Sequence, residues 1–276
     1  MQPSYQSGFY APGRGVAKHP ELWRGCVGAW NPGLGNTGLA LRDWSGYHHG
    51  MQPVASVNLE NAWTLISGKR GFLLDGVDDY VSAGIEDVWK FGAGKFTLSM
   101  WIFPTSFAAE FAIYDTLALS GAYQRTTSFV LVGTATTGKL RVYTSFAYSA
   151  STTAGLVINQ WNHIAIVRTS TSANGAQFFV NGIPDITVTI AASITSGGAV
   201  IGRYSDGPGG WLAGAFSDVM LLSQAATRRH IDVLKTRPGI AYERAPRKFY
   251  SLPAAAATGN PNGILQLNTQ SMRFGL

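Results

Sequence analysis

Short runs in which apolar and polar residues alternate recur along most of the chain. The clearest is Phe96-Thr-Leu-Ser-Met-Trp-Ile102, and Lys139-Leu-Arg-Val-Tyr143 repeats the pattern. Alternation with a period of two puts every second side chain on the same face of a β-strand. The apolar residues of the first run, which we expect to face a core, are Phe96, Leu98, Met100 and Ile102.

Similar runs, separated by turns rich in Gly, Asp and Asn, predict many short strands between Arg24 and Leu222. Many short strands with few helical patterns are typical of an all-β protein, either a two-sheet sandwich or a barrel. Examples of the expected strands are Cys26–Trp30, Gly71–Leu74, Tyr80–Ala83, Phe96–Phe103, Phe129–Gly133, Lys139–Phe146, Trp161–Thr169, Ala176–Val180, Ala199–Gly202 and Gly214–Leu222.

One helix is expected at the end of this region. Ser223 is a suitable N-cap for the segment Gln224–Lys235, and Arg237-Pro238-Gly239 ends the helical pattern. The apolar residues of this segment that could face the body are Ala226, Ile231 and Leu234.

The pattern divides the chain into three parts: an extended N-terminal arm (1–23), a sandwich with its closing helix (24–236) and an extended C-terminal tail (237–276). The arm sets aromatic residues among Gly and Pro and has no core of its own, so we expect it to dock on the body or on a neighbour. For the tail, a disordered end and strand addition to another subunit both remain open. The residues expected to mediate assembly are Tyr5, Phe9, Tyr10, Ile264, Leu267 and Phe274.

Composition and charge limit the kinds of partner that we expect this protein to bind. Hydrophobic residues make up 46% of the chain and charged residues 13%, and the formal net charge is +6. Basic residues cluster only modestly, in Arg228-Arg229 and Lys235–Lys248, so a weak attraction to an acidic surface is expected rather than nucleic-acid binding. Residues 1–15 lack a signal-peptide pattern and no run is long enough to span a membrane, so we expect synthesis in the cytoplasm and no membrane partner.

Five motifs occur in order along residues 24–236. They are Asp43-Trp-Ser-Gly-Tyr-His-His-Gly50, Leu74-Asp-Gly-Val-Asp-Asp-Tyr-Val81, Phe96-Thr-Leu-Ser-Met-Trp101, Trp161-Asn-His163 with Val180-Asn-Gly182, and Gly214-Ala-Phe-Ser-Asp-Val219. Their order resembles the laminin-G-like branch of the concanavalin A-like lectin/glucanase superfamily. The resemblance implies a two-sheet antiparallel β-sandwich of the jelly-roll type.

The flanking segments carry a second resemblance. Pro20–Trp30 and Arg237–Glu243 look like sequence found around such domains in the structural proteins of tailed phages and prophages. The resemblance implies a virion location and virion partners.

Four aspartates form the candidate metal site. Asp75, Asp78 and Asp79 share one turn, and Asp43 lies on a preceding element. Carboxylates grouped at one rim could bind Ca²⁺, which prefers six to eight oxygen ligands, and related domains sometimes hold calcium in such a place. The other interpretation is that these side chains fix the hairpin through Asx-turn hydrogen bonds. The sequence indicates no cofactor other than this calcium ion, and the turn-forming interpretation needs no cofactor.

Aromatic side chains beside loops are the candidates for glycan binding, because rings stack on sugar faces. The candidates are Trp211 and Trp44. The other interpretation is that they belong to the core, as large aromatic side chains in a sandwich usually do.

The sequence argues against catalysis. The glutamates show no Glu-x-Asp-x-(x)-Glu spacing, which would place paired carboxylates on one face of a strand as retaining glycosidases require. No Gly-x-Ser-x-Gly elbow, phosphate loop or His-Glu-x-x-His motif is present.

These observations predict a non-catalytic phage virion protein, a capsid decoration or accessory subunit. It would contact other virion proteins (capsid or tail) and its own copies through the sandwich and the arms, with weak affinity for a cell-surface glycan as an added property. The alternative is a carbohydrate-binding or adhesion module of a bacterial surface protein.

Overall fold

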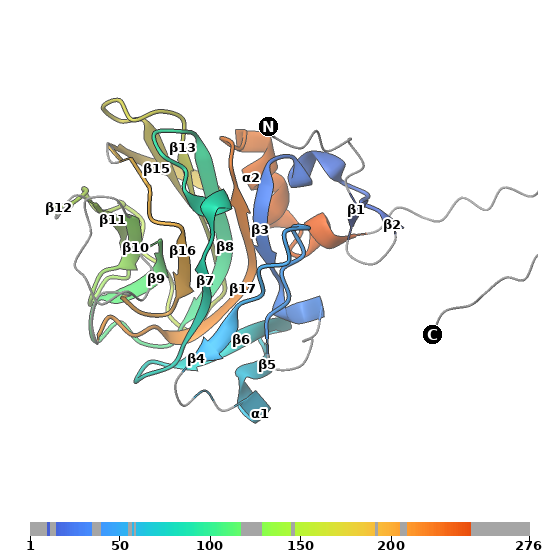
Figure 1. Cartoon of the computed structure of the whole chain (residues 1–276). Coiled ribbons are helices and arrows are strands. Elements are labelled where there is room, and N and C mark those ends of the chain that lie inside the picture. Colours follow the sequence, from blue (N-terminus) through green and yellow to red (C-terminus); the bar gives the residue numbers. More distant parts are fainter. Residues whose placement is uncertain are drawn as a thin grey trace, which may run out of the picture. The chain divides into compact units, whose positions relative to one another are not determined.

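Two antiparallel sheets lie face to face and enclose the main hydrophobic core (Figure 1). The structure is a computed structural model and describes residues 10–11, 15–34, 40–54, 57, 59–116, 129–144, 147–190, 193–204 and 209–243. The chain divides into two units, Met1–Ala245 and Pro246–Leu276, and the described residues all lie in the first. The all-β fold expected from the alternating runs is confirmed, and so is the two-sheet sandwich that the family resemblance implies.

The larger sheet has eight strands in the order β15-β14-β13-β8-β17-β6-β5, with β3 paired to β17. Its strands are β3 (Cys26–Trp30), β5 (Trp63–Ile66), β6 (Lys69–Asp75), β8 (Phe96–Pro104), β13 (Asn162–Arg168), β14 (Ala176–Val180), β15 (Ile183–Val188) and β17 (Ala213–Leu222).

The smaller sheet has seven strands in the order β12-β11-β10-β9-β16-β7-β4. Its strands are β4 (Gln52–Val54), β7 (Tyr80–Ile85), β9 (Phe111–Asp115), β10 (Phe129–Gly133), β11 (Leu140–Thr144), β12 (Ala147–Tyr148) and β16 (Gly198–Ile201). A separate pair joins β1 (Tyr10–Ala11) to β2 (Gly15–Val16).

The alternating pattern of β8 predicts correctly which of its side chains lie in the core. The four residues predicted to share a face lie in the main core, and β8 pairs with β13 on one side and β17 on the other. Burying a side chain of this size contributes about 1.5–3 kcal/mol. The residues of β8 that confirm the prediction are Phe96, Leu98, Met100 and Ile102.

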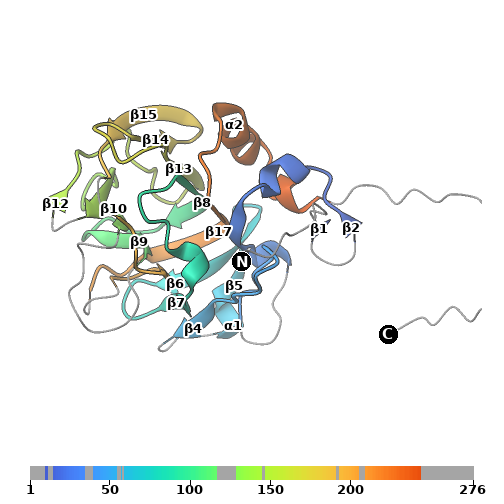
Figure 2. The ribbon, with the colours of Figure 1, turned by 45° about the horizontal axis from the view of Figure 1, so that its top comes forward.

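A second hydrophobic layer covers the outer face of the larger sheet. It is formed by α2 (Arg228–Thr236) and by the short 3-10 helices η1 (Pro20–Trp23) and η4 (Ile240–Tyr242), as Figure 2 shows. Residues of β13 alternate between the layers: Ile164 belongs to the main core, whereas Ala165 belongs to the second cluster. The remaining helices are α1 (Leu59–Ala62), η2 (Pro32–Leu34) and η3 (Asp87–Trp89).

The helix begins later than expected. Thr227, not Ser223, is the N-cap of α2, and the Thr227 side chain accepts a hydrogen bond from the backbone N–H of His230. The reason is tertiary: the hydroxyl of Thr97 on β8 donates to the carbonyl of Gln224 and accepts from the N–H of Ala226. These bonds hold residues 224–226 against the sheet in a non-helical conformation.

Most residues chosen for assembly lie outside the described part of the chain, namely Tyr5, Phe9, Ile264, Leu267 and Phe274. Tyr10 belongs to β1, and its side chain is not described. Within the described residues no helix is long and apolar enough to cross a membrane.

Candidate functional site

The turn between β6 and β7 brings three of the predicted metal ligands together. Ligand oxygens of Asp75, Asp78 and Asp79 lie within 4.8 Å of one another. Two carboxylates also support the turn: Asp75 accepts hydrogen bonds from the N–H groups of Val77 (2.8 Å) and Asp78 (3.3 Å), and Asp79 accepts one from the N–H of Asp75 (3.1 Å). The Asx-turn interpretation therefore describes real contacts.

The same turn could also hold a cation. Asp79 is 6% exposed, and its Oδ1 atom is buried with no hydrogen-bond partner. Burial raises the pKa of Asp79, the hydrogen bond from the N–H of Asp75 opposes this, and the charges of Asp75 and Asp78 raise it further. An unused buried oxygen beside two more carboxylates fits a Ca²⁺ site that backbone carbonyls or water would complete.

Asp43 does not join this cluster. Its carboxylate is 1% exposed and accepts four hydrogen bonds, from the N–H groups of Ala29, Ser45 and His49 and from the hydroxyl of Ser45. With its oxygens occupied in this way, Asp43 ties the segment after β3 to the sheet. The structure gives it a supporting role rather than that of a fourth ligand.

A polar and aromatic surface lies on the outer face of the smaller sheet. Leu140 and Val142 of β11 belong to the main core, so Arg141 and Tyr143 between and after them point to the opposite face. Tyr143 packs there with Tyr204 against a small apolar cluster of Ala112 (β9) and Val132 (β10). We call this surface the tyrosine face; its residues are Glu110, Arg141, Tyr143, Tyr148 and Tyr204.

Glu110 is the hub of the tyrosine face. Its carboxylate accepts a hydrogen bond of 2.6 Å from the hydroxyl of Tyr148 and another from that of Tyr204, and it forms an ion pair with Arg141. Burial by itself raises the pKa of Glu110, but these three partners outweigh burial and lower it. Glu110 therefore stays ionised at neutral pH, which suits an acceptor of hydrogen bonds and not a general acid.

The rings of the tyrosine face are held in fixed positions. The rings of Tyr143 and Tyr148 are 4.5 Å apart, and the guanidinium of Arg141 lies 3.7 Å from the centre of the Tyr148 ring. Tyr148 is 43% exposed, so part of this residue is accessible to a ligand. Burial and the hydrogen bond to Glu110 raise the pKa of both Tyr148 and Tyr204, so the two hydroxyls stay protonated.

Trp211 adjoins the same face, whereas Trp44 does not. Trp211 is half-buried beside Tyr80 of β7, with ring centres 6.2 Å apart, and Arg203 lies over both rings. Trp44 lies with Arg42 over its ring and packs against the second hydrophobic cluster, on the other sheet. The two tryptophans chosen from the sequence therefore belong to different surfaces.

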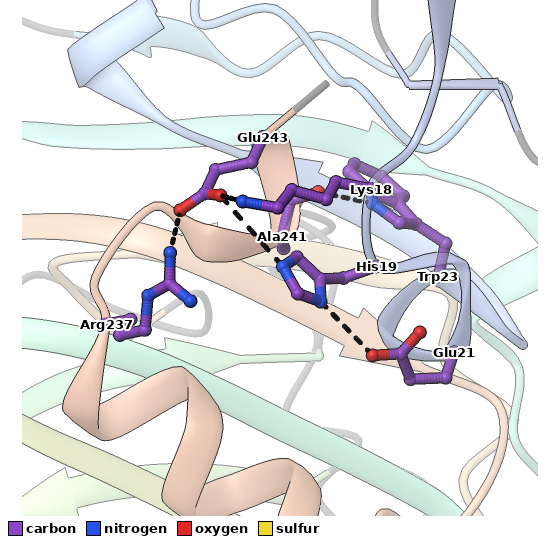
Figure 3. A network of polar contacts seen from close by, with 7 residues as sticks. All are labelled: Lys18, His19, Glu21, Trp23, Arg237, Ala241 and Glu243. Atoms are coloured by element: carbon purple, nitrogen blue, oxygen red, sulfur yellow. Dashed lines mark hydrogen bonds and ion pairs between the residues drawn. The ribbon is translucent and has the colours of Figure 1, made fainter. Parts of the chain in front are cut away.

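The two ends of the described chain meet on the outer layer of the larger sheet. The N–H of Lys18 donates to the carbonyl of Glu243 (2.9 Å), and the indole of Trp23 donates to the carbonyl of Ala241 (2.6 Å). The Glu243 carboxylate forms ion pairs with Lys18 and Arg237, and lies 4.0 Å from His19 (Figure 3). We call this network the terminal clasp, because it joins the segments that lead to both arms.

Residues 75–232, which are more than half of the chain, match a family model of the laminin-G type. The model is described as the concanavalin A-like lectin/glucanases superfamily. The chain belongs to this superfamily. No curated protein matches it in sequence.

Solved structures share the fold at low identity. Domain 4 of AbnA, a GH43 extracellular arabinanase from Geobacillus stearothermophilus, solved in complex with arabinotriose, has a TM-score of 0.58 at 14% identity over 76% of this chain and 98% of that domain. The receptor binding domain of botulinum neurotoxin mosaic serotype C/D has a TM-score of 0.58 at 14% identity over 78% of this chain. That of botulinum neurotoxin D has 0.55 at 14% identity, also over 78%. This chain spans 51% and 53% of those two structures.

Sequence reasoning missed the tyrosine face. Glu110 is separated by 31, 38 and 94 positions from Arg141, Tyr148 and Tyr204. No local motif marks such a group, because the sheet order alone brings its members together. The only available signal was an isolated glutamate before an apolar run, Phe111–Asp115.

Proposed function

We propose that this chain is a non-catalytic recognition protein that binds a glycan on its tyrosine face. The observation that carries the proposal is the Glu110 hub: an ionised acceptor, an arginine donor and two protonated phenols fixed on one solvent-facing sheet surface. Sugars offer hydroxyls that both donate and accept hydrogen bonds, and apolar ring faces that stack on aromatic side chains.

Preorganisation favours this use of the surface. The Tyr148 and Arg141 side chains are held by contacts within the protein, so they lose little freedom when a ligand binds. Domain 4 of AbnA, which shares this fold, was solved in complex with arabinotriose, so a sandwich of this fold can be part of a sugar complex. Both facts support a glycan ligand without identifying it.

A glycan array tests the proposal directly. We expect the wild-type protein to bind a restricted set of glycans, and a Glu110→Gln variant to lose that signal while keeping its fold by circular dichroism. Asp87→Asn is the matched control, because Asp87 is a highly exposed carboxylate on η3, away from the tyrosine face. No binding to any glycan, or equal binding by both variants, would remove the proposal.

We propose further that the terminal segments attach the protein to a phage particle, as a decoration or accessory subunit. The terminal clasp supports this, because it holds Lys18 and Glu243, which lie near the two ends of the described chain, against each other. Two binding segments tethered close together can engage a single neighbouring surface together, which raises their combined affinity. Both the virion location and the virion partners are part of this proposal.

Truncation separates this role from glycan binding. We expect that deleting residues 264–276 or 1–14 abolishes incorporation into particles and leaves glycan binding and the melting temperature nearly unchanged. Incorporation of a truncated protein at wild-type occupancy would eliminate the attachment role. The chain would then fit better the alternative of an adhesion module of a bacterial surface protein.

A further inference from the structure

A small pocket with polar walls lies between the outer face of the larger sheet and η4. Its walls include Ser99 and Trp101 of β8, His163 of β13, Asp218 of β17 and Tyr242 of η4. Its volume is about 10 Å³, which leaves room for one water molecule. A larger ligand does not fit without moving the walls.

Three side chains of these walls have a buried polar atom that lacks a hydrogen-bond partner within the described part of the chain. The atoms are Nε1 of Trp101, Nδ1 of His163 and Oη of Tyr242. His163 is 1% exposed and Tyr242 is 7% exposed, so bulk solvent does not satisfy these groups. Buried polar groups in native proteins are nearly always bonded to protein or to ordered water. Three of them around one pocket indicate an occupant that bonds to all three.

The ring of His163 shows which of its atoms is left for the pocket. Nε2 is bonded to the hydroxyl of Ser99 at 2.9 Å, so Nδ1 is the nitrogen that still needs a partner. The rings of His163 and Trp101 pack edge to face with their centres 5.4 Å apart. The two nitrogens without partners thus belong to neighbouring rings in the wall of the same pocket.

The groups around the pocket favour a neutral occupant. The carboxylate of Asp218 disfavours an anion, and it already forms an ion pair with Lys69. The N–H of Trp101 can only donate a hydrogen bond, which disfavours a cation. Burial, followed by the charges of Lys69 and Lys235, lowers the pKa of His163, so its ring is neutral. A water molecule has the right size and can both accept and donate.

The pocket adjoins the terminal clasp through Tyr242. The next residue, Glu243, binds Lys18 through both its carbonyl and its carboxylate. The ring of Tyr242 packs edge to face on Trp23, with ring centres 5.4 Å apart. A partner for the Tyr242 hydroxyl on the sheet side would therefore fix η4, and with it the clasp, against β8 and β13.

We propose that this pocket binds one water molecule, which bridges Tyr242 of η4 to Trp101 and His163 of the larger sheet. The water accepts hydrogen bonds from the indole N–H and the phenol O–H and donates one to Nδ1 of His163. Three bonds are the usual number for a buried water. The water thereby joins the terminal clasp to the sandwich, whether or not the protein binds a glycan or attaches to a particle.

The variant Tyr242→Phe tests the proposal by the direction of its effect. If the hydroxyl had no partner, its removal would relieve an unsatisfied buried group, and the melting temperature would stay the same or rise. If the hydroxyl binds the water, we expect the melting temperature to fall by about 2–4 °C. The amide of Lys18, which donates to the carbonyl of Glu243, should then exchange its hydrogen several times faster.

Tyr47→Phe is the control, because Tyr47 is 48% exposed and its hydroxyl lies away from the pocket. It should change neither the melting temperature nor the exchange of the Lys18 amide. A melting temperature of Tyr242→Phe equal to or above that of the wild type would overturn the proposal.

A high-resolution crystal structure gives a direct second readout. We expect density for one water molecule within hydrogen-bond distance of Trp101 Nε1, His163 Nδ1 and Tyr242 Oη. An ion in this place, an empty pocket, or a Tyr242 hydroxyl bonded to another protein group would each overturn the proposal.

Discussion

The hydroxyl of Tyr148 donates a hydrogen bond of 2.6 Å to the carboxylate of Glu110, and this contact joins the edge strand β12 to the segment before β9. Arg141 lies over the ring of Tyr148 and pairs with the same carboxylate. Strands β12 and β11 thus share one charged group, which is supplied by the segment before β9. Removing that charge is the most direct way to test what the surface does.

Glu110→Gln should weaken glycan binding about tenfold, which corresponds to about 1.4 kcal/mol. The amide keeps the shape of the side chain but removes the charge that orients Arg141 and the two phenols. Unfolding free energy should fall by about 1 kcal/mol, the usual size of a lost hydrogen bond at a partly exposed site. Isothermal titration calorimetry with a glycan selected on the array measures the first effect, and urea denaturation the second. Unchanged affinity would mean that ligands bind elsewhere.

Asp43→Ala should lower the unfolding free energy by about 3–5 kcal/mol, because it leaves one buried and two partly buried backbone N–H groups and one hydroxyl without their acceptor. Asp43→Asn retains part of the hydrogen bonding and should cost less. Chemical denaturation of both variants checks the order. A small effect of the alanine variant would show that the segment after β3 is held by other contacts.

His163 makes the fold sensitive to acid. Its ring is 1% exposed, bonded to the hydroxyl of Ser99 at 2.9 Å, and burial, followed by the charges of Lys69 and Lys235, lowers its pKa to about 3. Between that value and about 6.5 the unfolded chain binds a proton that the folded chain does not. Stability should therefore fall with falling pH in this window, by at most about 1.4 kcal/mol per pH unit from this group.

The control for the histidine prediction is His163→Gln, which cannot titrate and can still bond to Ser99. Its stability at neutral pH should be somewhat lower, but the difference from the wild type should shrink as the pH falls from 6.5. Parallel pH profiles for both proteins would contradict the assignment to His163.

Calcium provides the test of the β6–β7 turn. Millimolar Ca²⁺ should raise the melting temperature, and saturation tenfold to a hundredfold above the dissociation constant would correspond to about 1.4–2.7 kcal/mol. Asp79→Asn removes charge from the buried carboxylate and should abolish the rise, whereas Asp87→Asn should preserve it. No effect of calcium or chelator on the wild type would leave the aspartates with their turn-forming role alone.

The sequence pattern predicted several of the strands that form the core. Cys26–Trp30, Phe129–Gly133 and Ala176–Val180 match their strands residue for residue. Several strands lie outside the predicted ranges, among them β9 (Phe111–Asp115) and β15 (Ile183–Val188). All of β9 is buried and therefore does not alternate, and β15 is an edge strand that contains a proline.

The residue at which α2 begins could not be predicted from the local sequence. Ser223 and Thr227 are both acceptable caps, and only the contact of Thr97 with Gln224 and Ala226 selects the later one. A competing hydrogen bond from another strand cannot be read from the segment itself.

What the sequence by itself determined is many of the strands and the faces they bury, because a period of two and the turn residues are local properties of the chain. The ordered motifs, which are also local, carried the resemblance to the superfamily. The tertiary structure decided which polar residues meet. It separated Asp43 from Asp75, gathered the tyrosine face around Glu110, and joined Lys18 to Glu243 across 225 positions. These contacts depend on the order of strands in the sheets, which is a property of the whole fold.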